Sequence, residues 1–159
     1  MKKTVIADGD AGPPPDGESW LDIEALAEIE ITSDDPEHPI DAALEIKSTD
    51  NAWRAPNPGE QMIRVCFFQP QSIKRIRLVF EERTCARTQE VAIRWLPFGT
   101  AEEYREIVRQ QYNFSPPATT QEIEDYQVDL EKLKILELII LPEIGGGEAR
   151  ASLKELRLA

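Results

Sequence analysis

Apolar and polar side chains alternate along most of the chain after residue 26. In the segment 73–80, Ile76, Leu78 and Phe80 occupy one face, and Arg75 and Arg77 occupy the other. A period of two is typical of a strand with one buried face. The segments that share this period, or are rich in Ile and Leu, are expected to be strands: 27–32, 62–68, 73–80, 91–95 and 135–141. With turn signals about every 8–12 residues, the pattern predicts an all-β sandwich or barrel.

Two segments depart from this alternation. Residues 1–18 are rich in Pro, Gly and Asp and are expected to form a flexible acidic tail, so that a single domain occupies 19–159. Ser19 is placed to cap a short helix that runs through Leu26. Between 101 and 109 the apolar residues have helical spacing, and the pattern alone leaves helix and strand open there.

Composition restricts the kind of protein. The chain has 159 residues, 41% of them hydrophobic, which suits one domain with a real core. Its formal charge of −12 disfavours nucleic acid and anionic membranes as partners. No apolar run is long enough to span a bilayer, and Met1 is not followed by the apolar segment of a signal peptide. A cytoplasmic location is therefore expected, and the two cysteines fit a reducing compartment.

The residues that catalysis would need are scarce. The only histidine is His38, between two prolines, and neither cysteine has an activating context. No phosphate-binding loop or dinucleotide fingerprint is present, and no Cys/His spacing suits zinc or iron. No pair among the 30 acidic residues stands out as a glycosidase pair. We expect no enzyme activity, no cofactor and no metal.

Several stretches along the chain carry a resemblance to a known family. Ile29-Glu30-Ile31-Thr32-Ser33 is followed by a proline-bounded loop and the small apolar stretch 40–44; Trp53-Arg54 then precedes the strand pair 61–65 and 73–78. With the closing segment 151–158, these resemble discoidin-like (coagulation factor type C) modules of the galactose-binding-like superfamily. The resemblance implies an antiparallel jelly-roll β-sandwich. It also favours a strand at 103–110, with Tyr104 as the aromatic residue near its start.

One departure from the family concerns calcium. Where members usually carry an Asp-Gly turn, often part of a structural calcium site, this chain has Glu45-Ile46-Lys47. Asp34, Asp35, Asp41 and Asp50 could supply oxygen ligands, but calcium needs about six to eight of them around one point. Solvated surface carboxylates are the favoured interpretation.

Strand order predicts which end of the sandwich binds. Successive connections of an antiparallel sandwich alternate between its ends. This places the long connections 33–60, 83–87, 112–121 and 142–148 at one end and the turns 69–72, 97–102 and 131–132 at the other. Function tends to sit on long loops held by a rigid scaffold.

The predicted ligand-binding residues combine aromatic, guanidinium and amide groups, which suit the apolar face and the hydroxyls of a sugar. They are His38, Trp53, Arg54, Arg87, Tyr112 and Asn113. Simpler interpretations stand beside this one: Trp53 as a core residue, Arg87 as a partner of nearby carboxylates, His38 as a turn residue, and 110–117 as a loop that covers the sandwich edge. The sequence therefore predicts a non-catalytic module that binds carbohydrate or another small polar ligand. The alternative is an intracellular protein–protein interaction module on the same scaffold.

Overall fold

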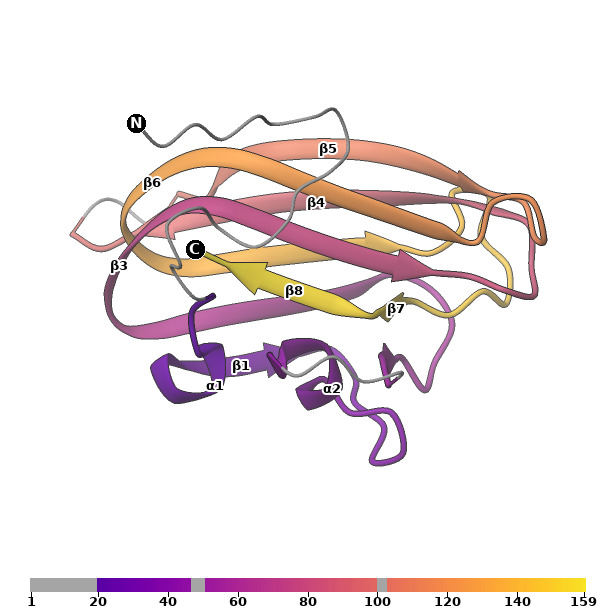
Figure 1. Ribbon diagram of the computed structural model, residues 1–159, viewed down its shortest axis with the longest axis horizontal. Helices are drawn as coiled ribbons and strands as arrows, with labels where there is room; N and C mark the ends of the chain where they lie inside the picture. Colours follow the sequence, from indigo (N-terminus) through magenta and orange to yellow (C-terminus); the bar gives the residue numbers. More distant parts are fainter. Residues whose placement is uncertain (1–19, 47–50, 100–102) are drawn as a thin grey trace, which may run out of the picture.

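Two long strands frame the structure, a computed structural model that describes residues 20–46, 51–99 and 103–159. β3 (Gln61–Glu81) and β6 (Gln121–Leu141) pair antiparallel along nearly their whole length. Both strands bend at the end of the sandwich drawn on the left in Figure 1, so that each contributes to two layers. This pairing of two bent strands produces an antiparallel jelly-roll sandwich, and the all-β prediction is confirmed.

The remaining elements pair with one half or the other of these two strands. β1 joins the first half of β3, β4 joins the second half of β6 and also pairs with β5, and β8 joins the second half of β3. β2 and β7 form a separate two-stranded sheet. The bounds are α1 Ile23–Leu26, β1 Ala27–Ile31, α2 Asp41–Leu44, β2 Trp53–Arg54, β4 Arg87–Pro97, β5 Arg105–Phe114, β7 Ser152–Leu153 and β8 Glu155–Leu158.

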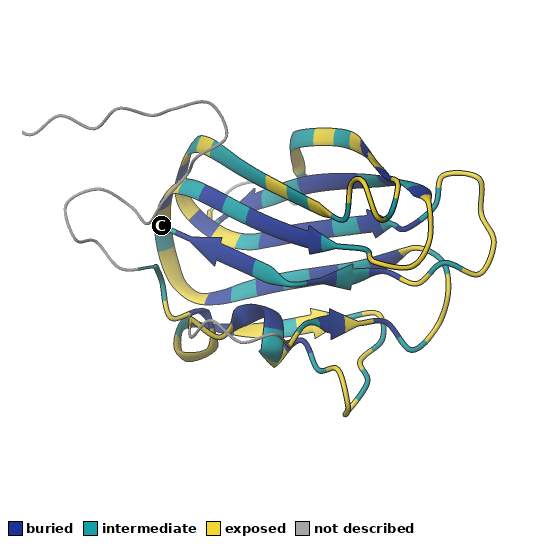
Figure 2. Cartoon of the chain, turned by 45° about the vertical axis from the view of Figure 1, so that its right-hand side comes forward, coloured by how far each residue is buried: buried dark blue, intermediate teal, exposed yellow. Residues whose placement is uncertain are grey.

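The core lies between the layers and follows the alternation of the sequence. In the first half of β3, Ile63, Val65 and Phe67 are buried while the residues between them are partly exposed. Figure 2 shows buried residues along the strands and exposed residues gathered in the loops. Burial of one face of each strand is the main stabilising contribution, at about 25 cal/mol per Å² of apolar surface.

The predicted turns at 69–72 and 131–132 do not interrupt their strands. Each is the bend of a continuous strand, because hydrogen bonding between β3 and β6 resumes beyond it with register shifts between Cys66 and Arg75. Lys132 adopts a positive φ of 57° at the bend of β6. The bends lie at the opposite end from the start of β4 and the end of β5 (Figure 1).

The segment with ambiguous periodicity is a strand. Residues Arg105–Phe114 form β5, so the helical alternative is wrong and the strand favoured by the family resemblance is confirmed. The loop expected to begin at 110–112 begins only after Phe114. Tyr112 and Phe114 are buried while Asn113 is exposed, so the alternation simply continues through residues first interpreted as a loop.

The first helix also differs from its prediction. α1 begins at Ile23, and Asp22 caps it by accepting a hydrogen bond from the Ala25 N–H at 3.3 Å. The predicted cap Ser19 and the predicted tail 1–18 lie outside the described residues. Within the described parts of the chain, no helix has the length and apolar character to cross a membrane.

One acidic side chain, Glu137, is fully buried where β6 lies between β3 and β4. Glu137 of β6 accepts hydrogen bonds from Arg64 Nε at 2.8 Å and from Arg94 Nε at 2.7 Å. The ring of Tyr104 covers both guanidinium groups, at 5.1 Å from Arg94 and 5.8 Å from Arg64. This arrangement explains how a carboxylate is tolerated in the middle of an Ile/Leu-rich strand.

Candidate functional site

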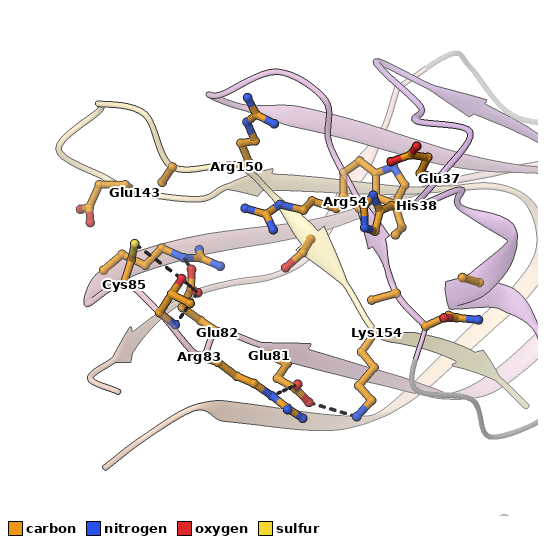
Figure 3. A pocket seen from close by; sticks show the side chains of 18 of the residues that line it. Glu37, His38, Arg54, Glu81, Glu82, Arg83, Cys85, Glu143, Arg150 and Lys154 are labelled. Carbon is orange, nitrogen blue, oxygen red and sulfur yellow. Dashed lines mark hydrogen bonds and ion pairs between the residues drawn. The ribbon is translucent and has the colours of Figure 1, made fainter. Parts of the chain in front are cut away.

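A cleft of about 870 Å³ opens at the loop end of the sandwich, and Figure 3 shows the side chains that line it. Three stretches of chain form its walls: the loop before α2 with the segment through β2, the connection between β3 and β4, and the segment from the end of β6 through β7. Prominent lining residues are Glu37, His38, Arg54, Glu81, Glu82, Arg83, Cys85, Arg87, Glu143, Glu148, Arg150, Ser152 and Lys154.

The β2–β7 pair forms one wall of this cleft. Trp53 pairs with Leu153 and Arg54 pairs with Ser152, and the Ala55 N–H donates to the Ala151 carbonyl at 2.9 Å. Because neighbouring residues of a strand point to opposite faces, the alternation separates core from cleft. Trp53 and Leu153 are fully buried, whereas the Arg54 side chain is exposed and lines the cleft.

A second wall is held in place by Arg87. Its Nε donates to Glu82 Oε1 at 2.7 Å, and its Nη1 donates to the Pro142 carbonyl at 2.7 Å and to Gln89 Oε1 at 2.8 Å. The guanidinium also lies 4.9 Å from the centre of the Phe114 ring. Partial burial would raise the pKa of Glu82, but hydrogen bonds from Arg87 and Thr84 outweigh it and lower that pKa. Arg87 therefore ties the connection between β3 and β4 to the segment that follows β6.

Other charged groups of the cleft are also engaged. Glu81 pairs with Arg83 and with Lys154, whose Nζ lies 3.0 Å from Glu81 Oε2 (Figure 3). Glu143 accepts hydrogen bonds from the backbone N–H groups of Thr88 and Gly145, each at 3.2 Å. The Glu143 contacts fix the loop that follows β6. All these pairings leave few free donors or acceptors on Glu81, Glu143 and Lys154 for a ligand.

His38 lines the cleft, and one of its two ring nitrogens contacts a carboxylate. His38 Nδ1 lies 3.3 Å from Asp35 Oδ2, and the His38 carbonyl accepts from the Arg54 N–H at 3.2 Å. The backbone N–H of Glu37 and the side chain of His38 both bind Asp35 and lower its pKa, with the Glu37 contact the larger. Nε2 makes no hydrogen bond within the described residues, so it remains available to a ligand.

Four of the six residues predicted for ligand binding line the cleft: His38, Trp53, Arg54 and Arg87. Trp53 is fully buried and its indole N–H donates to the Ser33 carbonyl at 3.4 Å, so it does not offer the exposed face that a stacking platform needs. Arg87 is likewise buried and committed to protein acceptors. Of the six predicted residues, only His38 and Arg54 are both exposed and part of the cleft lining.

Tyr112 and Asn113 are not brought into this cleft. The Tyr112 hydroxyl lies 2.9 Å from that of Tyr126, and its ring packs 6.1 Å from that of Phe80. Asn113 Oδ1 accepts from the Thr88 hydroxyl at 2.7 Å on the other face of β5. Their placement in the cleft failed as a prediction because β5 extends farther than expected and points Tyr112 into the core.

Beside Tyr126, Glu124 has an unusual pKa that predicts a pH dependence of stability. Partial burial, then the hydrogen bond and charge of Glu122, raise its pKa from 4.5 to about 7. Between these values the folded protein holds a proton that the unfolded chain has lost. This contribution to stability is therefore complete below pH 4.5 and lost as the pH rises through 7. The free energy of unfolding is expected to fall by roughly 1 kcal/mol over this interval, since solvent screens a partly exposed group.

Glu124→Gln tests this expectation when chemical denaturation is followed from pH 4.5 to 8. In this variant the free energy of unfolding is expected to fall less steeply with pH, and the variant is expected to be more stable than the parent above pH 7. Glu60→Gln, at an exposed site, is the control and is expected to keep the parental dependence of unfolding free energy on pH. Parallel pH profiles for Glu124→Gln and the parent would contradict the assignment.

Sequence reasoning missed Arg150 and Ser152, which line the cleft from β7 and the residues before it. The signal was available: the strand order placed the connection after β6 at the binding end, but its expected limit at 148 stopped short of both residues. As for metals, no group of three or more His, Cys, Asp or Glu in the described part of the chain is arranged to hold an ion. Asp34 Oδ1 accepts from the Ile40 N–H at 3.0 Å, and Asp50 lies outside the described residues.

No protein-family model and no curated protein matches this sequence. Solved structures do match its fold. A family 32 carbohydrate-binding module of C. perfringens NanJ, in complex with galactose, has a TM-score of 0.61 at 12% identity, over 87% of this chain and 96% of that one. The family 32 module of AlyQ, in complex with 4,5-unsaturated mannuronic acid, also has a TM-score of 0.61 at 12% identity, over 89% and 98%.

A third match is chitosan-binding module 1 of a chitosanase/glucanase from Paenibacillus sp. IK-5, with a TM-score of 0.57 at 16% identity, over 87% of this chain and 98% of that one. Each of these solved domains is matched over nearly its whole length, so the similarity extends to the complete sandwich. The chain described here has the discoidin-like, galactose-binding-like fold.

Proposed function

We propose that this protein is a non-catalytic carbohydrate-binding module whose ligand occupies the cleft between β2, β7 and the connection from β3 to β4. The observation that carries the proposal is the exposed pair of His38 and Arg54 in a cleft of about 870 Å³, with the imidazole Nε2 and the guanidinium free of protein partners in the described chain. Such donors and acceptors on rigid walls suit the hydroxyl groups of a sugar.

The fold supports the same proposal. The matched solved domains are carbohydrate-binding modules, and their names record galactose, unsaturated mannuronic acid and chitosan as ligands. A binding role also agrees with the chemistry of the cleft, where Glu81, Glu82 and Glu143 are engaged by protein donors. The alternative intracellular protein–protein interaction module draws no specific support from the described surface. The cytoplasmic location stays a prediction.

The test is a glycan array followed by chemical-shift mapping with the glycan bound best. We expect amide shifts to cluster at 37–41, 53–54, 82–87 and 148–152, with the bends at 69–72 and 131–132 unaffected. His38→Ala is expected to weaken binding by about 1 kcal/mol, the usual net value of one hydrogen bond. Gln71→Ala, at the opposite end, serves as the control. Absence of binding to any glycan, or shifts centred on the bends, would refute the proposal.

A further inference from the structure

Two arginines of the cleft stand out because no carboxylate lies within 4.0 Å of either, although Arg150 interacts electrostatically with Asp35 at longer range. The sequence contains 30 Asp and Glu against 18 Lys and Arg, so an exposed arginine readily meets a carboxylate. Arginines that do so within 4.0 Å are Arg64, Arg75, Arg77, Arg83, Arg87, Arg94, Arg109 and Arg157. Arg105 stacks 5.4 Å from the ring centre of Trp95 instead. In the described chain this leaves Arg54 and Arg150, both exposed and both in the cleft.

The strand pairing places these two side chains on one face. Arg54 lies directly opposite Ser152, and Arg150 precedes Ser152 by two residues, which returns its side chain to the same side. Ala151 between them is fully buried, as are Trp53 and Leu153, so the opposite face belongs to the core. A diagonal pair of this kind lies about 7–8 Å apart at the backbone, within reach of two long side chains. Figure 3 shows both arginines among the side chains that line the cleft.

The backbone around Arg150 is held firmly enough to keep this geometry. Gly59 bridges to Arg150, its N–H donates to the Ala149 carbonyl at 3.2 Å, and the Ala55 N–H donates to the Ala151 carbonyl at 2.9 Å. Side chains anchored on paired backbone lose less freedom when a ligand binds than side chains on a free loop.

We infer that the carbohydrate bound in this cleft carries a carboxylate, as a uronic or sialic acid does, and that Arg54 and Arg150 bind that group, with the Ser152 hydroxyl between them. This inference rests on the proposed function and narrows it to acidic glycans. A planar guanidinium presents paired N–H donors that match the two oxygens of a carboxylate. Two unpaired guanidinium groups with no protein carboxylate in contact leave those donors to the ligand.

The other carboxylates of the cleft do not compete for these donors. Glu81 and Glu82 are paired with Lys154 and Arg87, and Glu143 is held by backbone N–H groups. Four more carboxylates line the cleft, and none of them lies within 4.0 Å of Arg54 or Arg150: Glu37, Asp41, Glu45 and Glu148. Their negative charge limits the affinity for an anionic sugar without occupying the arginine donors.

The experiment compares acidic sugars with neutral counterparts of the same shape by isothermal titration calorimetry. The probes are trigalacturonic acid, trimannuronic acid and 3′-sialyllactose, each compared with its methyl ester. We expect at least one acid to bind about tenfold or more tightly than its neutral counterpart, and the preferred acid identifies the source of the carboxylate. Arg54→Gln and Arg150→Gln are each expected to weaken binding of that acid by about 10- to 100-fold and of the neutral counterpart by less than threefold.

Arg105→Gln is the matched control, because it removes the same charge from the start of β5, outside the cleft, and is expected to leave the affinity unchanged. Arg54→Lys retains the charge without the planar fork and is expected to give an intermediate affinity. Equal affinity for acid and ester, or equal losses for both in Arg54→Gln, would overturn the inference while leaving the proposed function intact. Failure of every glycan, acidic and neutral, would instead refute the proposed function itself.

Discussion

Replacing Trp53 with alanine is expected to lower the free energy of unfolding by about 3–5 kcal/mol, the usual cost of truncating a buried aromatic side chain. Trp53 is fully buried beside the β2–β7 pair, and its indole N–H donates to the Ser33 carbonyl. The truncation leaves a cavity behind the cleft wall and an unpaired carbonyl. Urea denaturation followed by circular dichroism measures the change.

Arg54→Ala is the matched control, since it is the next residue of the same strand and points away from the core. Its effect on stability is expected to stay within about 0.5 kcal/mol. Trp53→Phe should cost less than Trp53→Ala because most of the apolar volume is retained. A Trp53→Ala variant that kept parental stability but lost glycan affinity would contradict the burial and return Trp53 to the role of a ligand platform.

Replacing Arg87 with methionine is expected to cost about 3–5 kcal/mol, because a buried charge network loses one partner. Methionine keeps the length of the side chain against Phe114 but removes the donors that bind Glu82, Gln89 and the Pro142 carbonyl. Gln89 Oε1 and the Pro142 carbonyl would then lose their donor, and Glu82 would keep only its hydrogen bonds from Thr84. The denaturation midpoint is expected to fall with an unchanged slope, and the loops around the cleft to become more susceptible to proteolysis.

The control for Arg87 lies four residues earlier. Arg83 pairs with Glu81, but its side chain is 73% exposed, so Arg83→Met is expected to cost less than about 1 kcal/mol. If Arg87→Met proved as mild as Arg83→Met, the Arg87 contacts would not be what holds the two connections together. Arg87 would then again be a candidate for direct ligand binding.

The architecture could be predicted from the sequence because alternation acts locally. Side chains at every second position of a strand share a face, so residues such as Ile63, Val65 and Phe67 reveal a buried face without knowledge of the partner strand. The segment before Phe114 shows the limit of this reasoning. Its spacing fitted a helix at one end and a loop at the other, and only pairing with β4 from Arg87 to Trp95 makes it one strand.

The candidate site was predictable in its location but not in its members. Strand order indicates which connections share an end of the sandwich, and four of the six predicted residues line the cleft. The sequence does not indicate which way a side chain in an irregular connection points, because such a segment has no period. Trp53 is buried in the core and its neighbour Arg54 is exposed in the cleft, and the short pairing of β2 with β7 decides which of the two points inward.

Period-two alternation was a property of the chain by itself, and it determined a β-sandwich. Contacts between distant residues were decided only by the tertiary structure. Glu137 interrupts an apolar run in the sequence, yet it meets Arg64 and Arg94, which lie 73 and 43 residues away. Arg54 and Arg150, far apart in the sequence, line the same cleft for the same reason. The register between strands is fixed by burial of the whole core, so the groups placed side by side on the surface follow from packing that no local pattern contains.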